Sequence, residues 1–227
     1  MSENLTGLGL TPLGILGGTF DPVHRAHLQL AATACQQLGF AQVLWIPSGN
    51  PPHRVRPIAS ADQRLAMTAL AIQGEKRFVL DDSEVRSMAP SYSVNTLQRL
   101  RDKHDGKPLV LLLGADAYLG LASWYHWREI FGLAHIAVAT RPGYAFDSDA
   151  MDAGLREETG RRHNDDTSCL ALQAAGSLVT FSMPPLDISA SAIRTKLATG
   201  EVTADLLPAP VLDYIAANHL YSYRSNH

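Results

Sequence analysis

The chain has 227 residues, 46% of them hydrophobic, so it is long enough to bury a sizeable core. Its 19 Lys and Arg residues against 22 Asp and Glu residues give a formal net charge of −3, which argues against a general binder of nucleic acid or of a membrane surface. Any positively charged binding site must therefore be a local cluster of residues. We expect one α/β domain over residues 1–227.

Two further features concern location and redox state. The first residues lack a basic region that leads into a long apolar run, and no stretch reaches the roughly 18 apolar residues that span a bilayer. We therefore expect a cytoplasmic protein. The two cysteines, Cys35 and Cys169, show neither C-x-x-C spacing nor a metal-site pattern, so we expect reduced thiols and no metal held by the protein.

Short apolar runs alternate with helical patterns along the chain. The strand-like runs cover residues 13–16, 43–46, 78–80, 109–113, 136–139 and 178–181. The helical patterns cover residues 26–38, 61–72, 94–103, 127–131 and 170–175. This alternation predicts a Rossmann-like, doubly wound parallel sheet with a small C-terminal helical part. The ligand crevice of such a sheet lies at the carboxyl ends of its strands, and each motif below follows a predicted strand.

The stretch 17–28, between the first strand and the first helix, reads G-G-T-F-D-P-V-H-R-A-H-L. Gly17 and Gly18 let the backbone approach a ligand closely, and the helix start offers unpaired N–H groups and the positive end of a dipole. His24 and His27 are three residues apart, so they share one face of the first turn. A simple turn or an incidental surface histidine explains each piece alone, but the combination favours polyphosphate binding.

The second strand runs into the proline-rich loop 47–54, which cannot continue a strand or a helix. A His53-Arg54 pair stands at its tip, and the residues alone fit a solvated turn and a phosphate-binding loop about equally. The next helix opens on a capping box at Ser60. We interpret Arg64 in that helix as ordinary helix surface.

Two later strand ends carry small and polar residues. After the third strand, Ser91 or Ser93 can act as the N-cap of a helix, and a helix start exposes N–H groups. After the fourth strand, Gly114 permits the close approach of a ligand, and Asp116 can accept hydrogen bonds from ribose hydroxyls. Both groups are expected to face the crevice.

Three aromatic residues fall within positions 124–127, and aromatics so close together usually belong to the core. We expect Trp124 and Tyr125 to lie in a loop at the crevice, where a ring can stack on a flat heterocycle, and Trp127 to be buried. After the fifth strand, Arg141 can reach a phosphate.

The last third of the chain holds a charged segment and then a strong motif. The mixed-charge segment of about 145–168 has few large apolar residues, so we interpret it as an exposed connection. After the sixth strand, residues 187–194 read D-I-S-A-S-A-I-R. Ser189 can cap a helix whose first turns include Ser191 and Arg194, which brings donors, hydroxyls and a fixed cation to one place.

These motifs carry a resemblance to a known family. Residues 17–27 resemble the G-G-T-F-D-P-x-H-x-G-H signature of the nucleotidylyltransferase superfamily, with Ala26 in place of the usual Gly, and 187–194 resembles its I-S-S-T-x-I-R segment. The loop 51–54 and the stretch 91–97 resemble the P-P-H-[KR] and S-Y-T-x-x-T-L segments of the bacterial nicotinate mononucleotide adenylyltransferases. Those two segments narrow the resemblance to that family.

The resemblance implies adenylyl transfer from ATP to nicotinate mononucleotide, with Mg²⁺ supplied alongside ATP and with His24, His27 and Arg194 providing charge for catalysis. In the family, a Trp stacks on the pyridine ring and a helix start binds the pyridine carboxylate. The ATP-binding residues that it implies are Gly17, Gly18, Thr19, Phe20, His24, His27, Gly114, Asp116, Ile188, Ser189, Ser191 and Arg194. The acceptor-binding residues are Asn50, His53, Arg54, Tyr92, Ser93, Trp124, Tyr125 and Arg141.

Two alternatives stay open on the sequence. One is a relative in the same superfamily that acts on another phosphorylated acceptor, such as a phosphopantetheine adenylyltransferase or a cytidylyltransferase. The other is a non-catalytic nucleotide-binding module. A G-x-x-x-x-G-K-[ST] phosphate loop does not occur in the chain, and the oligomeric state is not readable from the sequence.

Overall fold

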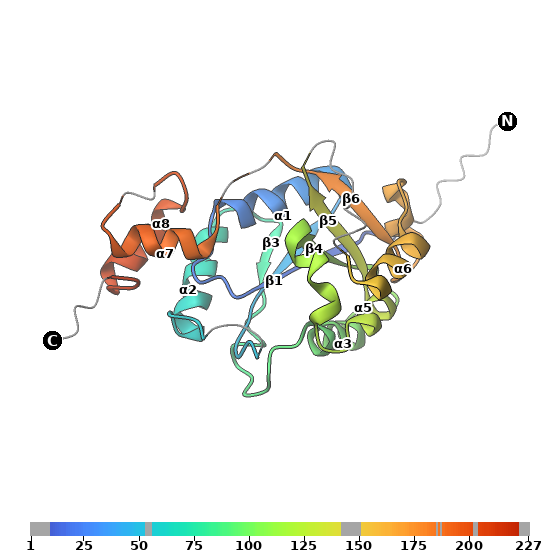
Figure 1. The fold of residues 1–227 in the computed structure, drawn as a ribbon, viewed down its shortest axis with the longest axis horizontal. Coiled ribbons are helices and arrows are strands. Elements are labelled where there is room, and N and C mark those ends of the chain that lie inside the picture. The colour runs from blue at the N-terminus through green and yellow to red at the C-terminus, as the bar shows by residue number, and fades with distance from the viewer. Residues whose placement is uncertain are drawn as a thin grey trace.

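The computed structural model describes residues 10–52, 56–141, 151–184, 186, 188–201 and 204–222. Its centre is a six-stranded sheet in the order β3-β2-β1-β4-β5-β6, with parallel pairing throughout (Figure 1). The strands are β1 (Leu13–Gly18), β2 (Gln42–Pro47), β3 (Phe78–Leu80), β4 (Leu109–Gly114), β5 (His135–Thr140) and β6 (Leu178–Ser182). All six predicted strands are confirmed, and the fold is the expected doubly wound α/β sheet.

Helices cover both faces of the sheet, and the last two gather at one end of the molecule beside α2 (Figure 1). They are α1 (Arg25–Leu38), α2 (Ala61–Ile72), α3 (Ser93–Lys103), α4 (Ala115–Leu119), α5 (Trp127–Leu133), α6 (Ala153–Arg162), α7 (Ala190–Ala198) and α8 (Ala209–Ala217). The pair α7 and α8 forms the small C-terminal helical part that the sequence predicts.

Side chains alternate between two hydrophobic cores along each central strand. In β4, Leu111 and Leu113 belong to the core with α3 and α5, whereas Val110 and Leu112 belong to the core with α1. Because both faces are covered by helices, both sets of side chains are buried, and the strand reads as a continuous apolar run.

The strand order reverses between β1 and β4, which are neighbours in the sheet although they are distant in sequence. The chain leaves β1 toward β2 on one side and leaves β4 toward β5 on the other. The loops at the carboxyl ends of β1 and β4 therefore diverge and leave a crevice between them. That crevice positions the site described below.

The predicted helix over residues 170–175 is wrong. A short 3₁₀ helix, η3 (Thr167–Ala171), occupies its first positions, and the rest is irregular. The carbonyl of Gln173 faces Nε2 of His135 at 2.9 Å, and the carbonyl of Ala174 accepts from Arg101 and from the Leu109 N–H. Since these carbonyls bind the neighbouring strands and α3, tertiary contacts override the local helix propensity.

The segment predicted as an exposed connection, 145–168, contains regular structure. Residues 142–150 lie outside the described residues, but helix α6 follows them, with Asp152 as its N-cap. The buried side chains of Met151 and Leu155 anchor it to the core beside α5. The sequence interpretation missed this helix because Leu155 is the only large apolar residue within it.

Three further expectations concern the cysteines, membrane-spanning helices and the number of domains. Cys35 and Cys169 are buried and unbonded, in agreement with the sequence interpretation. Among the described residues no helix is both long and apolar enough to cross a membrane. A single domain over residues 1–227 stays a prediction.

Candidate active site

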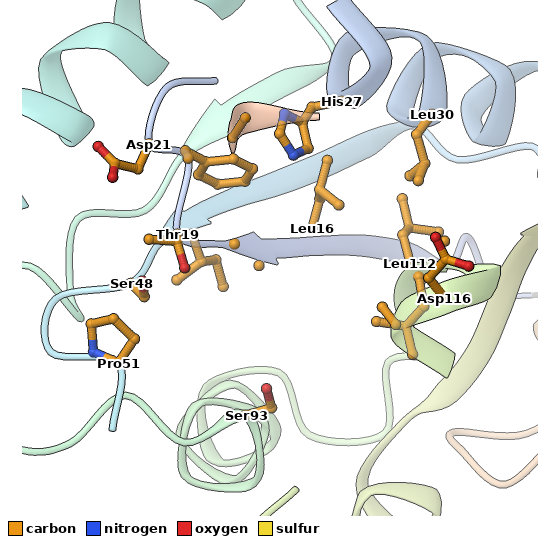
Figure 2. Close-up of a pocket in the computed structure, with 18 of the residues that line it drawn as sticks. Leu16, Thr19, Asp21, His27, Leu30, Ser48, Pro51, Ser93, Leu112 and Asp116 are labelled. Atoms are coloured by element: carbon orange, nitrogen blue, oxygen red, sulfur yellow. The ribbon is translucent and has the colours of Figure 1, made fainter. Parts of the chain in front are cut away.

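A cleft of about 1300 Å³ opens at the carboxyl ends of β1 and β4, at the reversal of the strand order. Figure 2 shows how it is assembled: His27 comes from α1, Asp116 from the start of α4 and Ser93 from the start of α3, around the end of β1. The predicted site residues that line it are Gly17, Gly18, Thr19, Phe20, His24, His27, Tyr92, Ser93, Gly114, Asp116, Trp124, Tyr125, Arg141, Ile188 and Arg194.

Three predicted site residues among the described ones are not in that lining. Asn50 lies on the loop after β2, and Ser189 and Ser191 lie at the exposed start of α7, where Ser189 caps the helix as expected by accepting from the Ala192 N–H. His53 and Arg54 lie outside the described residues. Their roles in binding stay predictions.

The two histidines of the first motif stand at the start of α1, with His24 as its N-cap residue. Their rings are stacked with centroids 3.7 Å apart, and the ring of Phe20 meets the His27 ring edge-on. The backbone N–H of His24 donates to Nδ1 of His27 at 3.2 Å. In the neutral ring the proton of His27 must therefore sit on Nε2, which makes Nε2–H a donor.

Both histidines are held in the neutral state. Burial lowers the pKa of His24 to about 4. Burial and the neighbouring His24 lower the pKa of His27 well below its ordinary value. In their neutral state these imidazoles act as hydrogen-bonding groups, and their part in stabilising phosphate charge stays a prediction.

The lowered pKa of His24 predicts a loss of stability in acid. As the pH falls from the ordinary histidine value of 6.5 toward 4, the unfolded chain takes up a proton that the folded chain refuses. The contribution of His24 to the free energy of unfolding is therefore fully present at pH 7, and it falls by up to about 1.4 kcal/mol per pH unit between pH 6.5 and pH 4. Urea unfolding at pH 7.5 and pH 5.5 should show a larger loss in the wild type than in His24→Gln. Equal losses would contradict the buried neutral state.

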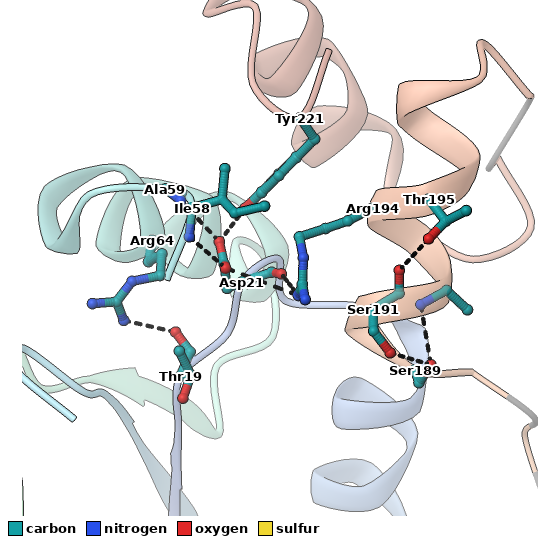
Figure 3. Close-up of polar contacts among 11 residues, drawn as sticks. Thr19, Asp21, Ile58, Ala59, Arg64, Ser189, Ser191, Arg194, Thr195 and Tyr221 are labelled. Carbon is teal, nitrogen blue, oxygen red and sulfur yellow. Dashed lines mark hydrogen bonds and ion pairs between the residues drawn. The ribbon is translucent and has the colours of Figure 1, made fainter. Parts of the chain in front are cut away.

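Asp21, which the sequence interpretation did not select, lies at the centre of the polar contacts beside the cleft (Figure 3). Its carboxylate is buried and accepts from the N–H groups of Ile58 and Ala59 at 2.9 and 3.1 Å. Nη1 of Arg194 donates to the backbone oxygen of Asp21 at 2.8 Å. Asp21 thus joins three segments: the first motif, the chain entering α2, and α7.

Arg64 is not ordinary helix surface, so that interpretation is wrong. Its side chain is 1% exposed, Nη1 donates to the carbonyl of Thr19 at 2.7 Å, and Nη2 donates to the carbonyl of Gly49 at 3.2 Å. Burial lowers the pKa of Arg64, while the nearby Asp21 opposes that change. One buried guanidinium therefore holds together the loops that follow β1 and β2.

Neither Ser91 nor Ser93 is the N-cap of α3, because the helix begins at Ser93 with Tyr92 in the cap position. Ser91 instead turns its hydroxyl toward the loop after β2, where it accepts from the N–H groups of Gly49 and Asn50, both at 3.0 Å. The start of α3 is thereby fastened to the loop, and its first turn has no side-chain cap.

Gly49 is the position in this loop where a side chain does not fit. A Cβ there would overlap the carbonyl oxygen of Glu84, which is backbone and cannot turn away. We expect Gly49→Ala to lower the free energy of unfolding by about 1–3 kcal/mol. Gly132→Ala is the matched control: it lies within α5, its Cβ would meet open space, and it should stabilise the chain by about 0.5–1 kcal/mol. Denaturant unfolding of both variants tests the difference, and equal stabilities would contradict the overlap.

The aromatic residues near 124–127 divide as the sequence predicts. Trp127 is 8% exposed and belongs to the core beside Phe131. Tyr125 is 47% exposed and stacks on Tyr92, with ring centroids 4.3 Å apart. Trp124 lines the cleft and is partly buried. The cleft therefore has an aromatic wall next to the uncapped start of α3.

Glu84 adds a carboxyl group to that end of the cleft. It accepts hydrogen bonds from the hydroxyls of Thr96 and Ser91, and burial raises its pKa. The sequence interpretation did not select it, because a carboxylate in an exposed-looking D-D-S-E-V-R stretch carries no signal of burial.

Two residues that depart from the superfamily motifs, Ala26 in place of Gly and Ala190 in place of Ser, lie differently with respect to the cleft. Ala26 is in the first turn of α1 and does not line the cleft, so its methyl group leaves the phosphate side open. Ala190 does line the cleft, at the first position of α7. The cleft therefore lacks the hydroxyl group that a serine at position 190 would supply.

The sheet order and the position of the cleft define a class: an α/β protein that binds a nucleotide at the switch point of a doubly wound sheet. A family model described as cytidylyltransferase-like matches residues 15–196. Among curated proteins, one from Dechloromonas aromatica named "Probable nicotinate-nucleotide adenylyltransferase" is 49% identical over 92% of this chain and 97% of its own length. One of the same name from Aeromonas salmonicida is 40% identical over 92% and 97%. The chain therefore belongs to the nicotinate-nucleotide adenylyltransferases, within the cytidylyltransferase-like family.

A solved structure shares the fold. The nicotinic acid mononucleotide adenylyltransferase of Plasmodium falciparum, complexed with NaAD, superposes with a TM-score of 0.70 at 17% identity and covers 93% of this chain and 97% of its own. At that identity the likeness concerns the fold alone.

Proposed function

We propose that the chain transfers the adenylyl group of ATP to nicotinate mononucleotide. A phosphate oxygen of the acceptor attacks the α-phosphorus of ATP, the bond from that phosphorus to the bridging oxygen breaks, and pyrophosphate leaves with the bond electrons. The observation that carries this proposal is one continuous cleft that holds both the histidine–arginine group and the aromatic start of α3. The acceptor phosphate is already a nucleophile, so the protein must supply mainly alignment and charge stabilisation.

The phosphate end of the cleft combines a neutral donor with one cation. Nε2–H of His27 can donate to a phosphate oxygen, whereas the N–H groups of His24 and Arg25 already donate to Nδ1 of His27 and to the Leu206 carbonyl. Arg194 brings a fixed positive charge from a different helix. These groups stabilise the charge that moves onto the leaving pyrophosphate.

The acceptor end is formed by the start of α3 and the aromatic wall. The uncapped first turn of α3 presents N–H donors near Ser93, and Trp124 and Tyr125 can face a flat pyridine ring. Arg141, which is exposed and follows β5 directly, lines the cleft and can reach the acceptor phosphate.

Mg²⁺ fits this site as a companion of ATP. Among the described residues no group of three or more His, Cys, Asp or Glu side chains is placed to hold a metal ion. When bound, Mg²⁺ neutralises and orients the phosphates. Thorough removal of transition metals should leave the Mg²⁺-supported rate unchanged, and loss of that rate, restored by zinc, would contradict this assignment.

Pyrophosphate release tests the proposed function directly. With ATP, the purified chain should release pyrophosphate in the presence of nicotinate mononucleotide and form nicotinate adenine dinucleotide. Phosphopantetheine is the comparison acceptor, and CTP is the comparison nucleotide. A higher kcat/KM with either comparison substrate favours a relative with another acceptor, and release with none of them favours a binding module. A cytoplasmic location stays a prediction.

A further inference from the structure

Tyr221, near the C-terminal end of the described chain, reaches back to the first motif. Its hydroxyl donates to Oδ1 of Asp21 at 2.7 Å across 200 residues of sequence, and its side chain is 6% exposed (Figure 3). Burial and the carboxylate of Asp21 raise the pKa of Tyr221, so the hydroxyl keeps its proton at neutral pH.

The carboxylate of Asp21 is held by three donors that are not Arg194. Oδ2 accepts from the Ile58 N–H, and Oδ1 accepts from the Ala59 N–H and from Tyr221. Nη1 of Arg194 is 3.9 Å from Oδ2, beyond hydrogen-bonding distance, and its short bond goes to the backbone oxygen of Asp21. The guanidinium is therefore near the carboxylate without forming the bidentate pair that arginine prefers.

Arg194 has space to move away from the cleft. A second cavity of about 840 Å³ lies behind it, and Ile58 and Arg194 line both cavities. Hydroxyl and amide groups line the second cavity, which makes it a favourable place for a guanidinium. They come from Gln63, Ser191, Thr195, Asn218 and Ser222. A contact within the protein must therefore keep the guanidinium of Arg194 on the cleft side.

We infer that Tyr221 is a positioning residue that acts through Asp21 on Arg194. Its hydroxyl holds Oδ1 of the carboxylate and so fixes the position of Asp21, whose backbone oxygen accepts from Arg194. Arg194 then keeps its single bond to the backbone of Asp21 and directs its remaining donors into the cleft, where the phosphates of ATP bind. This role rests on the proposed function and adds to it a residue from the far end of the chain.

Tyr221→Phe tests this role by removing one oxygen atom. We expect the KM for ATP to rise about tenfold, while the KM for nicotinate mononucleotide changes less than about twofold. Tyr118→Phe is the matched control, because that buried hydroxyl pairs with Thr159 at 2.7 Å in the core on the α5 side of the sheet. Both variants lose a buried hydrogen bond, so similar unfolding midpoints would separate positioning from general destabilisation. An equal ATP KM in the two variants would overturn the inference.

A double-mutant cycle identifies the group through which Tyr221 acts. In the Arg194→Ala background, Tyr221→Phe should leave the kcat/KM for ATP unchanged, because the group that it positions is gone. An undiminished effect there would overturn the inference. Calorimetric titration with ATP alone measures the same contrast without an acceptor. If nicotinate mononucleotide is not used but ATP affinity still depends on Tyr221, then the proposed function fails and the positioning role stands.

Discussion

Replacing His27 or Arg194 by alanine is expected to lower kcat by roughly 10²-fold or more, with smaller effects on the KM of the acceptor. His27 comes from the first turn of α1 and Arg194 from the middle of α7, and both line the same cleft. The reason differs between them. His27 loses a neutral Nε2–H donor whose direction is fixed by the His24 backbone, and Arg194 loses the cation that meets the leaving pyrophosphate.

The matched controls for these variants lie away from the cleft. His104→Ala changes a histidine at the far end of α3, and Arg161→Ala removes an exposed arginine whose partner is Glu158. Both controls should keep near-normal kcat. Steady-state kinetics of the four variants decide the matter, and a near-normal kcat in His27→Ala or Arg194→Ala would show that the assigned role is wrong.

A preference for nicotinate mononucleotide over nicotinamide mononucleotide is the other large effect, and we expect at least about 10²-fold in kcat/KM. The first turn of α3 has neither a side-chain cap nor an acidic residue, so its N–H groups can receive a carboxylate. An amide would turn its own NH₂ group against those donors. Each buried group left unpaired costs about 1–3 kcal/mol, and about 1.4 kcal/mol corresponds to a tenfold change.

Glu84 opposes this preference, because its carboxyl group lines the same end of the cleft and would repel a second carboxylate. Burial reduces that repulsion, because it raises the pKa of Glu84 and so favours the uncharged carboxyl group, while the hydrogen bonds from Thr96 and Ser91 oppose that change. Glu84→Gln should therefore increase the preference for nicotinate, and Trp124→Ala should weaken the use of both acceptors. Equal use of the two acceptors by the wild type would contradict the carboxylate pocket and leave the adenylyl transfer intact.

The fold was largely predictable because the strands of a parallel sheet that is covered on both faces appear in the sequence as short apolar runs, separated by helical patterns. The run 109–113 is buried on both sides in β4, as its uninterrupted leucines and valine suggest. The failures have one physical cause. The carbonyls of Gln173 and Ala174 bind His135 and Arg101, which are distant in sequence. Helix α6 is held in the core by Met151 and Leu155. Contacts of this kind cannot be inferred from the residues that neighbour these positions in the sequence.

The site was predictable to the extent that motifs follow strands, because the carboxyl ends of neighbouring parallel strands meet at one edge. That rule brings Gly114 and His27 to one cleft. It cannot reveal which side chains join the loops to one another. Arg64 was misinterpreted as helix surface because its partners Thr19 and Gly49 are 45 and 15 residues away. Asp21 was not selected because its carboxylate partners are 37 or more residues away. A charged residue inside an otherwise apolar helix face was the available signal for Arg64.

The contact between Tyr221 and Asp21 also sets an order of events during synthesis. A ribosome that has made the sheet and α7 has already made both histidines and Arg194, but the residue that completes the support of Asp21 comes 27 positions after that arginine. Asp21 in the first motif therefore lacks this partner until 200 further residues have been synthesised. Nascent chains that still lack this partner already contain the phosphate-binding groups, but not the contact that we infer to set their geometry.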